Sequence, residues 1–307
     1  MSRTNTARYD TACGFLPAKL RAFALQLDSD KKAFAEELRL RVGQPMSVLL
    51  PEGEQSKDAF GEVPSVTQED LEGMLDYVTE YSRYIAADTI RQGYISLKGG
   101  YRLGVCARAV MQNGTVENMR DISSLALRIV REKTGLAEPL IPKIMEGQRL
   151  CSTLILSAPG GGKTTLLRDM IRTLSLGSDD RFAKRVAVVD ERSEIAASFC
   201  GVPQMHIGNH TDVLDCCPKK IGIPLLLRAM NPQVIALDEI TTEEDIYCTA
   251  QAAHCGVSLL ATIHANSTEE LSQKPLWQTL LHTRVFSRAV VIENSGGKRQ
   301  YRVEVLD

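Results

Sequence analysis

Long apolar runs are missing from this sequence of 307 residues. No stretch approaches the roughly 18 consecutive apolar residues that a membrane-spanning helix requires, which excludes a direct transmembrane segment. The opening segment, Met1 to Arg8, also lacks the apolar core of a secretory signal peptide. We therefore expect a cytoplasmic protein; if it works at a membrane, another protein or a surface contact takes it there.

An excess of charge of one sign is also missing. The sequence holds 36 Lys and Arg against 38 Asp and Glu, a formal net charge of −2, so no overall field favours nucleic acid or anionic lipid. Basic residues are locally enriched from Arg83 to Lys133, but aromatic residues are only sparsely interleaved there. We therefore expect no nucleic acid among the partners.

A disulfide or zinc framework is missing as well. The eight cysteines are scattered along the chain, and several lie in apolar or helix-like runs. Cys216 and Cys217 form an adjacent pair, without a second pair at zinc-binding spacing. Reduced thiols are expected, as is usual in the cytosol.

A glycine-rich turn is the most informative feature that the sequence does contain. The apolar run Leu154 to Leu156 precedes the turn, and the helix-like segment Thr165 to Ile171 follows it. Glycines let consecutive backbone N–H groups point at phosphate oxygens, and the start of a helix adds its positive end. The pattern predicts a P-loop of the Walker A type whose nucleotide contacts come from Ser157, Ala158, Pro159, Gly160, Gly161, Gly162, Lys163, Thr164 and Thr165.

Two residues of this loop have specific expected roles. Lys163 should reach the β- and γ-phosphates of ATP, and Thr164 should bind Mg²⁺. Ser157 stands where the usual pattern has its first glycine, a position that we expect to set only the start of the loop. The alternative is a chance glycine turn, against which the Lys-Thr pair and both flanking segments argue.

A short apolar strand, Val234 to Leu237, ends in two acids of the Walker B type, Asp238 and Glu239. Sites in a parallel sheet form at the carboxyl ends of its strands, so these acids should lie beside the glycine-rich loop. Asp238 is expected to hold Mg²⁺ through water, and Glu239 to orient or deprotonate an attacking water. Solvated acids at a strand end are the alternative.

A second acidic group follows the apolar strand Val186 to Val189. Asp190, Glu191 and Glu194 should face the same crevice and are further candidate catalytic acids, although surface charge without a role remains the alternative.

A third apolar strand, Ser258 to Ile263, runs into His264. Thr262 or His264 could sense the γ-phosphate and relay its loss to a neighbouring subunit. A hydrogen-bonded structural role is the alternative for His264.

Strand–helix units repeat after the glycine-rich loop, which predicts an α/β fold with a parallel sheet covered on both faces. The chain should close with a hairpin from Ala289 to Val305. Before the loop, the pattern is mixed α+β, with a helix from Thr67 to about Tyr84 and strands at about 94–112. Pro139 and Pro142 place the boundary between domains 1–145 and 146–307.

The basic stretch of the first domain supplies candidates for an arginine finger, the arginine that stabilises charge on a transferred phosphoryl group. The candidates are Arg102, Arg120 and Arg128. A solvated basic face is the alternative.

Together these motifs resemble the secretion ATPase superfamily, the motors of type II and type IV secretion and of type IV pili. That superfamily combines a Walker A loop, an acidic box, a Walker B strand and a histidine box, which match Gly160–Thr164, Asp190–Glu194, Asp238–Glu239 and His264. The acidic box departs from the pattern of the motors, because it reads Asp-Glu-Arg-Ser-Glu instead of Glu-Asp-Pro-x-Glu.

Within the superfamily, the sequence is similar to the stage III sporulation AA family. Four segments carry this narrower resemblance: Leu38–Pro45, Gly93–Leu97, Gly99–Gly104 and Val189–Ile195. It implies a RecA-like P-loop NTPase core with a smaller N-terminal α+β domain, in which arginines that follow the first domain's strands reach the nucleotide.

The resemblance also implies an ATPase that uses ATP and Mg²⁺ and assembles into a homo-oligomeric, hexameric ring. Such a motor would power a membrane-embedded, secretion-like channel complex from the mother-cell side of the forespore. Two other functions remain open from the sequence: a nucleotide-dependent scaffold with little turnover, and a nucleic-acid translocase on the same core.

Overall fold

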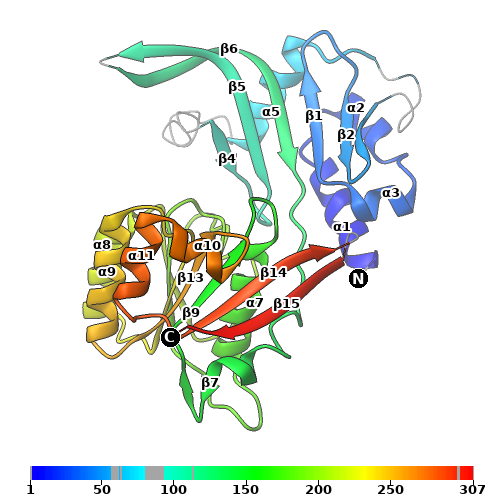
Figure 1. The fold of residues 1–307 in the computed structure, drawn as a ribbon. Coiled ribbons are helices and arrows are strands. Elements are labelled where there is room, and N and C mark those ends of the chain that lie inside the picture. The colour runs from blue at the N-terminus through cyan, green and yellow to red at the C-terminus, as the bar shows by residue number, and fades with distance from the viewer. Residues whose placement is uncertain are drawn as a thin grey trace. The chain divides into compact units, whose positions relative to one another are not determined.

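The computed structural model describes residues 2–56, 62, 64–79, 93–112, 114–295 and 298–306. It divides the chain into two compact units, Met1–Arg131 and Glu132–Asp307, which are drawn in Figure 1. The division comes earlier than the boundary predicted after residue 145. The segment before that boundary packs within the second unit, where the backbone N–H of Ala137 donates to Asp169 at 2.8 Å.

The first unit is α+β, as predicted. Its antiparallel sheet has the strand order β3-β2-β1-β6-β5-β4. The strands are β1 (Glu37–Arg41), β2 (Ser47–Leu50), β3 (Gly53–Gln55), β4 (Tyr94–Ser96), β5 (Arg102–Gln112) and β6 (Thr115–Arg128). The described helices are α1 (Ser2–Cys13), α2 (Ala18–Ala24), α3 (Ser29–Phe34) and α5 (Gln68–Val78).

Helix α5 begins where the sequence predicts it. Thr67 caps the helix, because its hydroxyl accepts from the N–H of Asp70 while the Asp70 carboxylate accepts from the N–H of Thr67. Leu71, Met74 and Leu75 are buried on one face. The helix ends at Val78, and the remainder of the predicted helix falls mostly outside the described residues.

The described residues of the second unit form a seven-stranded sheet of order β11-β10-β12-β13-β9-β14-β15. All neighbouring pairs are parallel except β14 and β15, which form the predicted closing hairpin. The strands are β9 (Thr153–Ser157), β10 (Val186–Asp190), β11 (Thr211–Asp215), β12 (Val234–Leu237), β13 (Ser258–His264), β14 (Arg288–Ser295) and β15 (Lys298–Val305). A separate ribbon pairs β7 (Met145–Glu146) with β8 (Arg149–Leu150).

Helices cover both faces of this sheet, and every residue of β9, β10 and β12 is buried. Such continuous apolar strands are characteristic of parallel sheets covered on both sides. The helices are α7 (Lys163–Leu176), α8 (Lys219–Ala229), α9 (Glu243–His254), α10 (Thr268–Gln273) and α11 (Pro275–His282), with the short 3₁₀ helix η1 (Ile141–Ile144) before them.

One apolar core joins alternate residues of the strands to α8, α9 and α11, which lie together in Figure 1. The buried residues of α7 are absent from this core. Because α7 contacts β9, β10 and β13, it covers the other face of the sheet.

The parallel strands end at a common edge. Ser157 at the end of β9 lies beside His264 at the end of β13, and Leu237 of β12 lies beside Val189 of β10. This register brings the segments that follow the four strands to the same edge of the sheet. No helix in the described part of the chain is long and apolar enough to cross a membrane.

Candidate nucleotide-binding site

The glycine-rich loop connects β9 to α7 in a conformation that depends on its glycines. Gly160 has φ of +72° and Gly162 has φ of +100°, values that side chains strongly disfavour. A Cβ on Gly161 would lie 2.2 Å from the Oγ of Ser157. Ser157 therefore does more than set the start of the loop, because its buried side chain lies directly against Gly161.

The exposed part of the loop leads directly into the first turn of a helix. Ala158, Pro159 and Gly160 are exposed, and α7 begins at Lys163 directly after the glycines. The first N–H groups of a helix have no partner within the helix, and they carry its positive end. Thr164 and Thr165 lie half-buried in this first turn, and their contacts to phosphate stay a prediction.

Lys163 lies against its own loop. Its Nζ donates to the carbonyl oxygens of Ser157 at 3.0 Å and Ala158 at 3.2 Å, and it contacts Nδ1 of His264 at 2.7 Å. Burial lowers the pKa of Lys163, while the nearby carboxylates of Glu239 and Asp238 act in the opposite direction. The predicted phosphate-binding lysine is thus already inside the loop.

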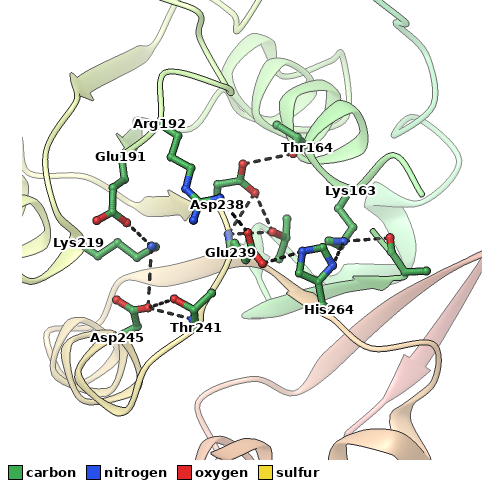
Figure 2. A network of polar contacts seen from close by, with 12 residues as sticks. Lys163, Thr164, Glu191, Arg192, Lys219, Asp238, Glu239, Thr241, Asp245 and His264 are labelled. Carbon is green, nitrogen blue, oxygen red and sulfur yellow. Dashed lines mark hydrogen bonds and ion pairs between the residues drawn. The ribbon is translucent and has the colours of Figure 1, made fainter. Parts of the chain in front are cut away.

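His264 connects Lys163 to the strand-end acids. Its Nε2 lies 2.6 Å from Oε1 of Glu239, as Figure 2 shows. A lysine ammonium can only donate, so Nδ1 of His264 accepts and Nε2 carries the hydrogen that Glu239 accepts. Arg192 adds its Nη1 at 3.6 Å from Oε2 of Glu239. The result is a continuous polar chain from the loop to the end of β10.

Asp238 holds a second set of contacts. One carboxylate oxygen accepts from the Thr164 hydroxyl at 3.2 Å and the other from the Thr262 hydroxyl at 2.8 Å. The contact between Thr164 and Asp238, visible in Figure 2, joins the two residues predicted to bind Mg²⁺. A hydroxyl and a carboxylate are ligands that Mg²⁺ accepts, and nucleotide phosphates ordinarily complete its coordination.

Glu239 is fixed by its backbone as well as by its side chain. Its N–H is shared by Asp238 at 3.1 Å and the Thr262 hydroxyl at 2.9 Å. Its φ of +27° is unusual for a residue with a side chain. Thr262 therefore contacts both acids, and its role as a γ-phosphate sensor stays a prediction.

The acids that follow β10 lie farther from the loop. Asp190 is fully buried, and its carboxylate accepts from the N–H groups of Glu194, Ile195 and Ala196. Burial raises its pKa to about 6, although these three N–H groups oppose the shift. Two strands, β12 and β13, separate β10 from β9 in the sheet. These contacts make Asp190 an organiser of the loop after β10, and its catalytic role stays a prediction.

Glu191 and Glu194 have different partners. The Glu191 carboxylate lies 2.5 Å from Nζ of Lys219, a buried lysine that is also 3.9 Å from Asp245. The backbone carbonyl of Glu194 accepts from the Arg168 guanidinium of α7 at 2.6 Å. Of the predicted acids, Asp238 and Glu239 are therefore the two that contact Thr164 and His264.

The candidate finger arginines belong to the first unit. Arg102 stacks over the Tyr94 ring at 4.2 Å from its centroid, and Arg128 lies 3.5 Å from Glu37. Arg120 lies opposite Arg108 on the hairpin of β5 and β6. Their role at the nucleotide stays a prediction.

Three site residues were missed by the sequence reasoning. Arg192 lies within the acidic box, where its charge could have drawn attention. Lys219 and Arg299 carry no motif, and their positions emerge only from the fold. Arg299 of β15 places its Nη2 3.5 Å from the carbonyl oxygen of Gly160.

Comparison with solved structures finds a similar fold in an ATPase and in a pilus retraction motor. The ATPase DotB of Legionella pneumophila matches with a TM-score of 0.59 and 18% identity, over 89% of this chain and 77% of that chain. The pilus retraction motor PilT with bound ADP matches with a TM-score of 0.61 and 18% identity, over 89% and 80%. The predicted α/β class with a RecA-like core is confirmed.

Sequence comparison is more specific. Stage III sporulation protein AA of Bacillus subtilis (strain 168) is 35% identical over 282 residues, which cover 92% of this chain and 90% of that protein. A family model described as "Sporulation stage III, protein AA" matches residues 8–303. The chain therefore belongs to the stage III sporulation protein AA family.

Proposed function

We propose that this protein is a Mg²⁺-dependent ATPase that acts as a motor or assembly factor during sporulation. The observation that carries the proposal is the meeting of Lys163, the Thr164–Asp238 pair and the His264–Glu239 pair at one edge of the sheet. The fold shared with DotB and PilT, the latter solved with ADP, supports the same activity.

Lys163 and the loop would bind the phosphates of ATP. Phosphate oxygens are stronger acceptors for an ammonium than the carbonyls of Ser157 and Ala158 that Lys163 now contacts. Thr164 and Asp238 would hold Mg²⁺, which supplies charge neutralisation at the β- and γ-phosphates.

Glu239 would activate the attacking water. Its carboxylate accepts the proton as the water oxygen bonds to the γ-phosphorus, and the bond from that phosphorus to the ADP oxygen breaks. His264 would orient Glu239 through the Nε2–H contact. The same imidazole contacts Lys163. Movement of Lys163 toward phosphate would therefore shift His264 and, through it, the carboxylate of Glu239.

The assembly and the partners extend this proposal. An arginine of the first domain or of a neighbouring copy would complete the site, in a homo-oligomeric and hexameric ring. The ring would drive a membrane-embedded channel complex from the cytoplasm, on the mother-cell side of the forespore. Membership of the sporulation family supports this setting.

Two variants test the proposal, with phosphate release and nucleotide binding as measurements. Lys163→Ala should abolish turnover and weaken ATP binding, because the charge at the phosphates is lost. Glu239→Gln should bind Mg-ATP normally but hydrolyse it at least about 100-fold more slowly, since the base is neutral. Glu243→Gln is the matched control, because Glu243 is exposed in the first turn of α9, and it should keep the wild-type rate.

Each deviation has a clear meaning. A normal rate in Lys163→Ala would exclude this loop as the active site. Hydrolysis by Glu239→Gln within about tenfold of the wild type would move the catalytic role to Glu191 or Asp190. A third outcome combines two results: the wild type binds ATP without turnover, and Glu239→Gln is fully active in sporulating cells. That outcome would identify a nucleotide-dependent scaffold.

A further inference from the structure

Arg299 lies against the phosphate loop although it is far from it in sequence. A Cβ placed on Gly162 would be 2.6 Å from Nη1, 2.8 Å from Cζ and 3.2 Å from Nε of Arg299. The guanidinium therefore covers the backbone of Gly162, in the space that any larger residue would need. Its Nη2 reaches the Gly160 carbonyl oxygen at 3.5 Å.

This cation has weak partners in the described part of the chain. The Gly160 contact is at the outer limit of a hydrogen bond, and the described carboxylates form no ion pair with Arg299. Arg302 on the same strand differs, since it pairs with Glu293 and Glu304. An exposed guanidinium beside a phosphate loop, without an anion of its own, is suited to an anion that arrives with the ligand.

The strand order indicates which part of the nucleotide Arg299 would meet. Asp238 and Glu239 follow β12 and His264 ends β13, on one side of the loop strand β9, and in the proposed function they mark the γ-phosphate end. The hairpin of β14 and β15 lies on the other side of β9. A triphosphate whose γ-phosphate points to β13 extends its α-phosphate toward β14 and β15.

We propose that Arg299 is a nucleotide contact supplied by the same chain, which binds the α- and β-phosphates of ADP and ATP from the closing hairpin. The inference rests on the proposed function, because it concerns the same site. On binding, the guanidinium exchanges the Gly160 carbonyl for phosphate oxygens, which form stronger, charge-assisted hydrogen bonds. Arg299 thereby contributes affinity common to substrate and product, in contrast to Glu239, which acts on the water that attacks the γ-phosphate.

Calorimetric titration of the full chain tests this assignment, with ADP and with a non-hydrolysable β,γ-imido analogue of ATP, both with Mg²⁺. Arg299→Ala should lower the affinity for both ligands by a similar factor of about tenfold, as expected for the loss of a charged hydrogen bond. Arg299→Gln should behave alike, and Arg299→Lys should lose less because it keeps the charge without the planar fork. Arg302→Ala is the matched control and should bind both ligands as the wild type does.

The other outcomes overturn the inference in distinguishable ways. If the wild type binds ADP and Arg299→Ala binds it equally well, Arg299 is no nucleotide contact, while the proposed function stands. A loss confined to the ATP analogue would assign Arg299 to the γ-phosphate and contradict the strand-order argument. If the wild type binds neither ligand, the proposed function fails and the inference fails with it. Should Arg299→Ala not fold, as thermal melting would reveal, the Gln and Lys variants decide the question.

Discussion

At the residue scale, Glu239 is the most constrained residue of the site. Its backbone has φ of +27°, a strained value of the kind that persists where surrounding contacts determine it. Asp238 and Thr262 share its N–H, and His264 contacts its carboxylate. The proposed base is therefore oriented before a nucleotide binds, so that the proposed hydrolysis would need little reorganisation.

Asp190 contributes differently, because it stabilises a loop of unusual backbone geometry. Ser193 and Ala197 have φ of +54° and +48° without being glycine. The buried carboxylate of Asp190 accepts three N–H groups from this segment. It thereby holds in place the loop that carries Arg192, whose side chain approaches Glu239.

The pKa of Asp190 predicts how stability depends on pH. Burial raises that pKa to about 6, above the ordinary value of 3.8. The folded state therefore binds this proton more tightly than the unfolded state, and its stabilising effect is lost as pH rises from about 4 to about 6. Relative to Asp190→Asn, the wild type should lose on the order of 3 kcal/mol of unfolding free energy across this window. Urea unfolding of both proteins at several pH values measures this difference in unfolding free energy. The same pH dependence of the unfolding free energy in both proteins would contradict the prediction.

At the element scale, local patterns predicted the strand ends well. Glycines before Lys163 and acids after β12 are short-range signals, and the parallel register then places them together. The contact between Arg299 and Gly160 joins residues separated by 139 positions, which no local pattern encodes. The buried position of Asp190 was likewise hidden, because an acid at a strand end has the same sequence signature whether it faces a ligand or a loop.

Packing of α8 on the sheet provides a prediction at this scale. A Cβ on Gly222 would lie 2.8 Å from Cγ1 of Val189 and 3.2 Å from Cδ2 of Leu214. Gly222→Ala should therefore destabilise the protein by about 1–3 kcal/mol through overpacking. Gly73 is the matched helical control, since a Cβ there meets nothing within 4 Å, and Gly73→Ala should stabilise α5 by about 0.5–1 kcal/mol. Denaturant unfolding compares the two variants, and equal stability would contradict the packing argument.

At the scale of the whole molecule, the sequence predicted two domains but located their boundary too late. Pro139 and Pro142 indicate where regular structure is interrupted, and η1 begins between them at Ile141. The prolines do not reveal that Ala137 already contacts Asp169 of α7. Boundaries between domains depend on such long-range packing. The prolines alone therefore predicted a boundary after residue 145, whereas the structure divides the chain after Arg131.

A shared site between copies would be visible in mixtures of inactive proteins. Alanine variants of Arg102, Arg120 or Arg128 retain Glu239, while Glu239→Gln retains all three arginines. If the finger comes from a neighbouring copy, mixing one such arginine variant with Glu239→Gln should restore some activity. Failure of every mixture would argue against a finger supplied by a neighbour.

The most direct test of the central claim, an ATPase whose sites are completed by neighbouring copies, is the hydrolysis rate per subunit as a function of protein concentration. Lys163→Ala at each concentration serves as the blank. The account predicts a specific rate above the blank that rises with concentration as neighbours complete each site. An appreciable rate that is independent of concentration, from subunits that remain monomeric across the range, would contradict it.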